Sequence, residues 1–341
     1  MIEPNLHLIG RRTTRVLRGA LWIVALSMPG VEADTIVKTS GQRIEGVEIS
    51  AARWDQILYK QAGNTFQAPG DTVASVERDS AVVARVRSAL ESGDYAEAIA
   101  QAKRAETGVQ GWELAEAQYL VGKIYLRSGK FREAEDAFAA YLKANESTKD
   151  YWTPHAVEGR GLAALELNRG GTAQEHFKTL ATFGETWTLR ATLGEAQGLV
   201  LKKEYVEARN QFNKVARDRK APDSLKAQAL VGRANVMVLQ EQYDAAIREL
   251  QSTFFENPSP ELLEYSKARA EASYLMGVCY AKQGGKPNLE NAEIWLLRTA
   301  VLYRAHASVY SNACKELSSV YKALGRDDRA SDWERRAGAS G

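Results

Sequence analysis

Residues 115–146, AEAQYLVGKIYLRSGKFREAEDAFAAYLKANE, decide the fold of this chain. Apolar side chains recur three or four positions apart on both sides of the break at residues 128–130, which predicts two amphipathic helices joined by a tight turn. Gly122 and Ala134 are small where the two helices must cross, so the helix axes can approach each other closely. The stretch therefore predicts a tightly packed helical hairpin.

The same pattern recurs along the chain. An alanine follows the predicted turn in seven units, and an aromatic residue precedes that alanine by three positions in four of them. The alanines are Ala98, Ala134, Ala173, Ala208, Ala246, Ala292 and Ala330. Several units carry a large apolar residue four positions later, at Phe138, Phe177, Phe212, Leu250 and Leu296. The position equivalent to Gly122 holds Gly161, Ala196, Ala234, Gly277 and Ser318 in later units.

This hairpin resembles the tetratricopeptide repeat (TPR), whose unit has 34 residues. The proposed units begin near residues 79, 115, 154, 189, 227, 270 and 311, so most of them are longer than the family's unit. The resemblance covers residues 79–337 and implies a mainly α fold, a right-handed α-solenoid of about seven TPR-like helical hairpins. A single hairpin cannot bury both faces, so stacking of neighbours supplies a continuous core.

Residues 34–78 lack a helical period and alternate instead between apolar and polar side chains, which predicts five short strands in a small antiparallel β module. The segment looks like the SH3-like β modules that precede repeat domains in some exported bacterial proteins. Trp54 and Tyr59 are expected in its core, with ligand binding as the alternative. Residues 338–341 are expected to form a flexible tail.

Residues 1–33 have the layout of a secretory signal peptide with cleavage after Ala33. Four arginines precede the apolar run of residues 19–28, which as a helix would reach only about 15 Å, half of a bilayer core. An uncleaved membrane anchor is the alternative. We expect a periplasmic or secreted protein without a stable membrane span after cleavage, and the evenly mixed charges argue against a nucleic-acid partner.

Motifs for chemistry are absent from the sequence. It has no phosphate-binding loop, dinucleotide fingerprint, zinc-protease motif or nucleophile elbow, and its histidines lie on different predicted repeats. We therefore expect no catalytic residue, no metal and no cofactor. Cys279 and Cys314 are interpreted as two buried small residues, with a disulfide as the alternative in an exported protein.

The TPR resemblance implies a concave groove lined by the first helix of each repeat. Carried over to this chain, the groove positions are Tyr119, Lys123, Arg127, His155, Arg190, Gln197, Asn235, Tyr274 and Lys282, with Arg87, Glu158 and Lys315 at further equivalent positions. Tyr119, Lys123 and Arg127 are spaced to form one ridge that could hold an acidic or aromatic peptide segment. The alternative is a solvated face whose charge Glu116 balances.

The sequence favours an exported TPR scaffold or adaptor that binds a protein or peptide of the cell envelope through its concave groove, without catalysis. A chaperone-type carboxylate clamp is not expected, because Asn235 alone matches its asparagine position. Two other functions stay open, a structural, self-assembling component of an envelope complex and a carbohydrate-binding or enzymatic accessory protein. The oligomeric state stays open as well.

Overall fold

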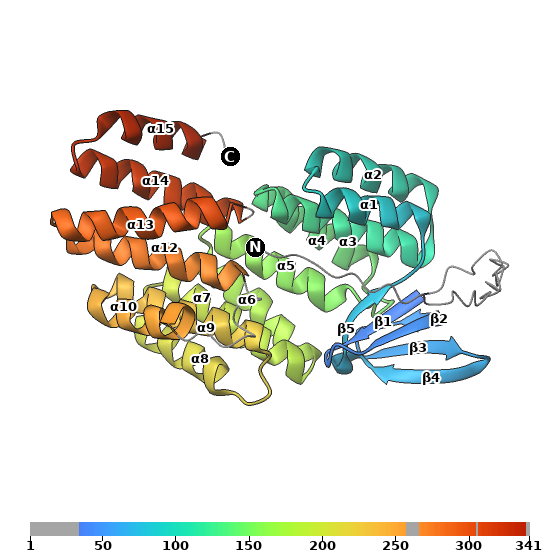
Figure 1. Ribbon diagram of the computed structural model, residues 1–341. Helices are drawn as coiled ribbons and strands as arrows, with labels where there is room; N and C mark the ends of the chain where they lie inside the picture. Colours follow the sequence, from blue (N-terminus) through green and yellow to red (C-terminus); the bar gives the residue numbers. More distant parts are fainter. Residues whose placement is uncertain (1–33, 257–265, 305, 339–341) are drawn as a thin grey trace, which may run out of the picture. The chain divides into compact units, whose positions relative to one another are not determined.

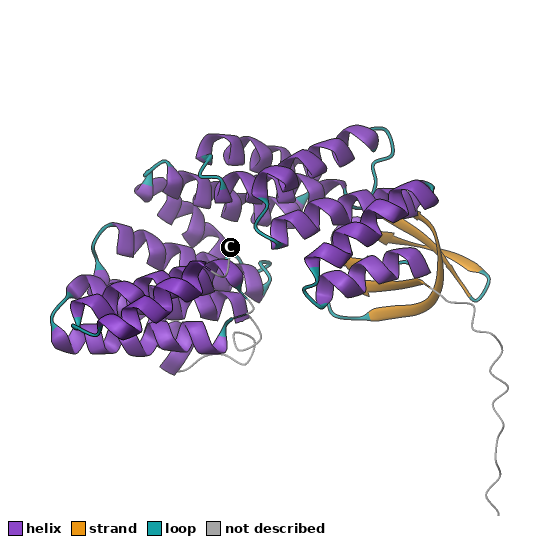
Figure 2. Ribbon diagram, turned by 90° about the horizontal axis from the view of Figure 1, so that it is seen from above, coloured by secondary structure: helices purple, strands orange, loops and turns teal. Residues whose placement is uncertain are grey.

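The computed structural model describes residues 34–256, 266–304 and 306–338. Within these ranges the chain begins with a small β-sheet and continues entirely with helices (Figures 1 and 2). The predicted signal peptide lies outside the described residues, as do residues 339–341 of the predicted tail at 338–341, whereas Gly338 is the last residue of a helix.

The β module is one antiparallel sheet of five strands in the order β4-β3-β2-β1-β5, which confirms the predicted strand content. The long central strand β2 pairs with β1 along one part of its length and with β3 along another, and irregularities interrupt both registers. The strands are β1 (Asp34–Lys38), β2 (Arg43–Ala52), β3 (Gln56–Gln61), β4 (Asn64–Pro69) and β5 (Val73–Glu77), with a 3₁₀ turn η1 (Gly70–Thr72) between the last two. The SH3-like character of this module stays a prediction.

The core of the sheet lies on one face, where alternate residues of the strands meet. Tyr59 belongs to this core, as expected, and Tyr151 from the helical region completes it. At Gly70 a Cβ atom would lie 1.9 Å from the backbone oxygen of Trp54, so this position accepts glycine alone. The buried strand residues are Ile36, Val47, Ile49, Ile57, Tyr59, Ala68, Val73 and Val76.

Two backbone hydrogen bonds join the sheet to the loop before the third helical hairpin. The amide of Trp54 donates to the carbonyl of Lys149 at 3.1 Å, and the amide of Tyr151 donates to the carbonyl of Ala52 at 3.1 Å. The Trp54 ring also meets Phe183 edge to face, with ring centroids 5.0 Å apart. The β module is therefore packed against the third repeat as well as being continuous with the first.

Fourteen α-helices follow in the described residues, arranged as seven hairpins, which confirms the TPR-like architecture. The first helices of the hairpins are α1 (Ala81–Glu91), α3 (Gly111–Arg127), α5 (Thr153–Glu166), α7 (Glu185–Leu201), α9 (Asp223–Leu239), α12 (Ser266–Gln283) and α14 (Ala307–Ala323). The second helices are α2 (Tyr95–Gly108), α4 (Phe131–Ala144), α6 (Gly170–Leu180), α8 (Tyr205–Arg217), α10 (Tyr243–Gln251), α13 (Lys286–Leu302) and α15 (Asp327–Gly338). The short segments η2 (Ala181–Phe183) and η3 (Ser252–Glu256) extend α6 and α10.

The turn inside each hairpin needs one residue in the left-handed region, because the chain reverses there within a few residues. Glycine occupies this position at Gly93 and Gly129, whereas Asn168, Lys203 and Glu241 adopt positive φ in the next three hairpins. In the fourth hairpin the amide of Glu204 donates back to the carbonyl of Leu199 at 2.9 Å, closing the end of the first helix. The equivalent bond is present in six of the seven described hairpins, so the turn geometry is shared even where the glycine is not. The sixth hairpin differs, and its turn has two glycines with positive φ, Gly284 and Gly285.

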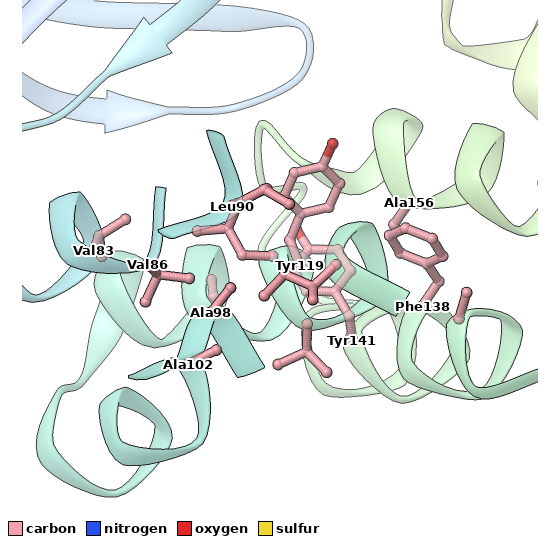
Figure 3. Close-up of a cluster of buried hydrophobic side chains, with 14 of the residues drawn as sticks. Val83, Val86, Leu90, Ala98, Ala102, Tyr119, Phe138, Tyr141 and Ala156 are labelled. Atoms are coloured by element: carbon pink, nitrogen blue, oxygen red, sulfur yellow. The ribbon is translucent and has the colours of Figure 1, made fainter. Parts of the chain in front are cut away.

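The seven alanines of the sequence pattern are all fully buried, with 0% exposure. The large residues that follow them fill the space between hairpins, as Figure 3 shows for Phe138 beside Ala156 of the next hairpin. A Cβ atom added to Gly122 would lie 2.5 Å from the Phe138 ring, and one added to Gly159 would lie 2.4 Å from it. Phe138 is therefore enclosed by a glycine of its own repeat and a glycine of the following repeat.

Candidate functional site

The first helices form one layer in which each helix contacts the first helices of the adjacent repeats. All nine predicted groove residues lie on this layer. Tyr119, Lys123 and Arg127 are on α3, and His155 and Arg190 are on α5 and α7. Asn235 is on α9, Tyr274 and Lys282 are on α12, and Gln197 is a half-buried residue of α7. The five residues on α3, α5 and α7 other than Gln197 lie together in one region. The three residues on α9 and α12 lie together around a cavity further along the array.

The prediction that Tyr119 forms part of a binding ridge on α3 is wrong, because the side chain is buried. This side chain is 7% exposed, and its ring stacks on Trp152 with centroids 4.7 Å apart and an angle of 12° between the planes. It also packs against Phe138 and Tyr141 of α4 (Figure 3). Burial raises the pKa of the Tyr119 hydroxyl. Tyr119 is thus a core residue beneath the surface on which Lys123 and Arg127 lie.

His155 lies at the centre of an aromatic cluster that three consecutive first helices and their leading loops supply. Its ring centroid is 4.7 Å from that of Trp187, with the rings perpendicular, and 5.2 Å and 5.5 Å from those of Tyr151 and Trp152. Burial, then the positive charges of Arg190 and Lys123, lower the pKa of His155 to about 3. The imidazole is therefore neutral at neutral pH and acts as another polarisable ring of the cluster. We refer to Tyr119, Tyr151, Trp152, His155 and Trp187 as the His155 cluster.

Charged side chains surround the His155 cluster, and two of the cations are already paired. Arg190 donates to Glu158 at 3.0 Å. Arg87 donates through its Nε atom to Glu116 at 2.8 Å, and Glu116 is only 1% exposed. Burial raises the pKa of Glu116, while Arg87 opposes that rise. Glu116 is therefore the partner of Arg87. The geometry does not favour the alternative in which Glu116 balances the charges of Lys123 and Arg127 on a solvated face.

Lys123 and Arg127 form no ion pair with any residue that the structure describes. Lys123 is half-buried, and its ammonium lies 6.0 Å from the centre of the Tyr119 ring. Burial lowers the pKa of Lys123, and the nearby positive charge of Arg127 lowers it further. Two adjacent cations with unfilled hydrogen-bonding capacity, one of them partly shielded from water, form a favourable place for a carboxylate of a ligand.

A cavity of about 480 Å³ lies further along the array, between the end of α9, the start of α10 and α12. Three of the predicted groove residues, Asn235, Tyr274 and Lys282, line it. Four of its nine lining residues are aliphatic, and the other five are polar, charged or tyrosine side chains, so the cavity can contact both apolar and polar groups of a ligand. The remaining lining residues are Val238, Leu239, Glu241, Tyr243, Leu275 and Val278.

Trp152 and Trp187 contact His155 but are not among the groove residues that the TPR resemblance implies. A signal was present: Trp152 precedes His155 by three positions, and Trp187 precedes Arg190 by three positions, at a spacing of one repeat. Equivalent positions of neighbouring repeats stack on each other, so the pattern places both pairs on the same face. Tyr151 gave no such periodic signal.

Other kinds of site find little support in the described ranges. No three histidine, cysteine, aspartate or glutamate side chains there lie close enough to hold a metal ion. Cys279 and Cys314 are both buried free thiols, and burial raises the pKa of Cys279 to about 12. None of the described helices is long and apolar enough to cross a membrane.

Comparison with known proteins supports the fold. The family model described as tetratricopeptide repeat matches residues 83–147 and 119–184. A solved tetratricopeptide repeat protein from Parabacteroides merdae ATCC 43184 is similar over 76% of this chain and 92% of its own, with 17% identity and a TM-score of 0.50. NprR, solved in complex with its cognate peptide NprX, is similar over 74% of both chains, with 14% identity and a TM-score of 0.54. No curated protein matches the chain.

The family match covers the second and third hairpins completely and most of the first. The later hairpins continue the same buried alanine and the same pairing of first and second helices, and all of them but the sixth continue the same turn geometry. Residues 83–184 therefore match the tetratricopeptide repeat family, and the other helical hairpins of the described residues have the same fold.

Proposed function

We propose that this protein is a scaffold that binds an acidic, partly apolar peptide segment of another protein across the first helices α3, α5 and α7, without catalysing a reaction. The observation that carries the proposal is the pair Lys123 and Arg127, two cations without a carboxylate partner among the described residues, beside the aromatic His155 cluster. A bound carboxylate would supply the hydrogen-bond acceptor that these two side chains lack.

Two further features support a peptide ligand. The half-buried rings of Trp152 and His155 offer apolar contact area next to the two cations, so an acidic residue and a neighbouring apolar residue can bind together. NprR, a protein of similar fold, was solved with a bound peptide, which shows that this architecture can hold one. The cavity at Asn235, Tyr274 and Lys282 offers a second contact point for a longer segment.

Binding to an array of immobilised peptides tests the proposal. The array contains acidic peptides with one aromatic residue, the same peptides with the acids replaced by amides, and basic counterparts. We expect the purified protein to prefer the acidic set, with binding that weakens as salt rises, because the contacts are charge-assisted and partly exposed. Equal binding to the acidic and amide sets would contradict the proposal.

A charge-reversal variant locates the contact. Lys123→Glu/Arg127→Glu is expected to lose the preference for acidic peptides. Lys130→Glu/Arg132→Glu is the matched control, since it reverses two exposed cations of the same hairpin that lie at the start of α4. Loss of binding in both variants, or in neither, would show that Lys123 and Arg127 do not form the binding site.

We also propose that the protein acts after export, as residues 1–33 suggest. The partner would then be a protein of the cell envelope. Mass spectrometry of the protein recovered from its native cells tests this, and the expected first residue is Asp34. A recovered chain that still carries residues 1–33, found in the cytosol, would contradict export and would leave the proposed binding site untouched.

A further inference from the structure

The strand β4 is an edge of the sheet that lacks the usual protection. It pairs with β3 alone in the sheet order, and Figure 1 shows it as the outermost strand. Four of its first five residues are exposed. Edge strands usually carry charges, an irregular register or an early proline, which prevent pairing with another chain. The sequence NTFQAP has no charge, its pairing with β3 is regular over all six residues, and Pro69 stands at its far end.

The hairpin geometry defines which backbone groups of β4 are unpaired. The turn between β3 and β4 has two residues, Ala62 and Gly63, both with positive φ, and Gln61 faces Asn64 across it. In such a hairpin the residues next to the turn exchange both hydrogen bonds, and every second pair after them does the same. Asn64, Phe66 and Ala68 therefore bond to β3. The N–H and C=O groups of Thr65 and Gln67 point away from the sheet.

The side chains of β4 divide between the two faces in the same alternation. Ala68 lies opposite Ile57 and is buried in the core of the sheet. Phe66 lies opposite Tyr59 on that same face and stacks on its ring with centroids 5.6 Å apart, yet it is 43% exposed. An exposed aromatic ring thus continues the apolar core up to the unpaired edge.

We propose that β4 pairs with β4 of a second copy of this chain, antiparallel, about a two-fold axis that passes through Phe66. In this register Thr65 of each copy faces Gln67 of the other. These are the residues with outward backbone groups, so each facing pair can exchange both hydrogen bonds. The two Phe66 residues face each other as a pair that is not hydrogen-bonded, the arrangement in which cross-strand side chains come closest.

The absence of charge on β4 favours a second copy as the occupant. In a two-fold antiparallel pairing each strand meets its own sequence, so a charged residue near the axis would face an equal charge. The strand NTFQAP avoids this, and its Phe66 ring meets an identical ring on the same face of the joined sheet. This dimer rests on the sheet and is independent of the proposed peptide site on the helices.

Sedimentation velocity over a range of protein concentrations tests the dimer. A single short strand pair is a small interface, so we expect a monomer–dimer equilibrium that shifts toward the dimer as concentration rises. The backbone N–H of Gln67 bonds to nothing in the described chain, so the hairpin can stay folded in Gln67→Pro. The proline removes a hydrogen bond of the proposed strand pair and should weaken the dimer by about tenfold or more. Val206→Lys is the control, because Val206 is another exposed apolar residue, 64% accessible, and it lies on α8.

Cysteine cross-linking tests the register. With the axis at Phe66, the two copies of Phe66→Cys place their Cβ atoms about 5 Å apart, so oxidation should produce a covalent dimer in high yield. Asn64→Cys lies on the same face, but its two copies are about 13 Å apart in this register, so it should cross-link poorly. Cys279 and Cys314 are buried and serve as a constant background.

Three results would overturn the inference. They are a monomer at every concentration, a dimer that Gln67→Pro leaves unchanged, and equal cross-linking at positions 64 and 66. The second of these would place the dimer contact elsewhere on the molecule. Circular dichroism of each variant shows that the comparison is between folded proteins.

Discussion

The ring of Phe138 fills the space that a side chain at Gly159 would need. A Cβ atom at Gly159 would lie 2.4 Å from the ring, although Phe138 belongs to the second repeat and Gly159 to the third. Gly194 stands in the same relation to Phe177 one repeat later, at 2.3 Å. Phe138 and Phe177 therefore each contact the following repeat as closely as their own.

Gly159→Ala is expected to destabilise the protein by about 1–3 kcal/mol, because the added methyl group overpacks a ring that is fully buried. Urea denaturation followed by circular dichroism measures the change. The control is Gly171→Ala in α6, where nothing lies within 4 Å of the added atom. That substitution should be neutral or stabilise by up to about 1 kcal/mol, since alanine favours a helix. A Gly159→Ala variant as stable as the control would contradict the proposed packing.

Lys203→Gly is expected to stabilise the protein slightly. Lys203 has φ of 63°, a conformation that costs a side-chain-bearing residue about 1–2 kcal/mol. Glycine removes this cost but has more freedom in the unfolded chain, so the net gain should be about 0.5–1 kcal/mol. The midpoint of urea unfolding measures it. Lys202→Gly, one position earlier with φ of −79°, should instead destabilise, and stabilisation by both would show that the left-handed turn is not the cause.

The low pKa of His155 predicts a stability that depends on pH. In the folded protein His155 binds a proton only near pH 3, whereas in the unfolded chain it does so near 6.5. Below pH 6.5 the unfolded state therefore binds more protons, and the free energy of unfolding should fall as pH drops toward 3. By pH 5 the loss should reach up to about 2 kcal/mol.

His155→Gln is expected to remove this part of the pH dependence, because glutamine does not titrate. The measurement is the difference between the urea midpoints of wild type and variant at each pH from 7 to 4. Glu116, whose pKa is raised by burial, acts in the opposite direction and is present in both proteins, so the difference isolates His155. A difference that stays constant with pH would contradict the assignment.

Removal of Arg87 should leave a buried carboxylate without its partner. Arg87→Met is expected to cost about 2–4 kcal/mol, since Glu116 is 1% exposed and would have to take up a proton or remain charged in the core. The double variant Arg87→Met/Glu116→Gln should recover a large part of that stability, because glutamine carries no charge. Denaturation of the two single variants and the double variant checks this. Purely additive losses would mean that the two side chains do not interact.

Much of the fold was accessible from the sequence because the repeat displays the same physical requirement seven times. Ala134 alone is an unremarkable alanine, but six further alanines at repeat spacing identify a crossing where nothing larger fits. The contact between Phe138 and Gly159 was missed, although Gly159, Gly194 and Gly232 also recur at repeat spacing. The residues within one hairpin do not reveal this contact, because it forms only when the next hairpin stacks on the ring.

The candidate site was predictable only in part. Helical spacing placed Tyr119, Lys123 and Arg127 correctly on one face of α3. The spacing within a helix does not show which residues of that face a neighbouring segment buries. Trp152 covers Tyr119 and leaves Lys123 half-buried and Arg127 exposed. Asn235, Tyr274 and Lys282 share a cavity because α9 and α12 are neighbours, a fact that follows from the repeat count and not from any motif.

The two backbone hydrogen bonds between the β module and residues 149–151 change how the array should unfold. Repeat arrays hold together through contacts between neighbours, so their ends can open one unit at a time. Here the sheet at the beginning of the chain is fastened to residues about one hundred positions later, and the first two hairpins lie within the loop so formed. Those hairpins cannot detach from the third without disrupting the sheet as well. Amide exchange should therefore find the first three repeats opening as one cooperative block, while the last hairpin frays on its own.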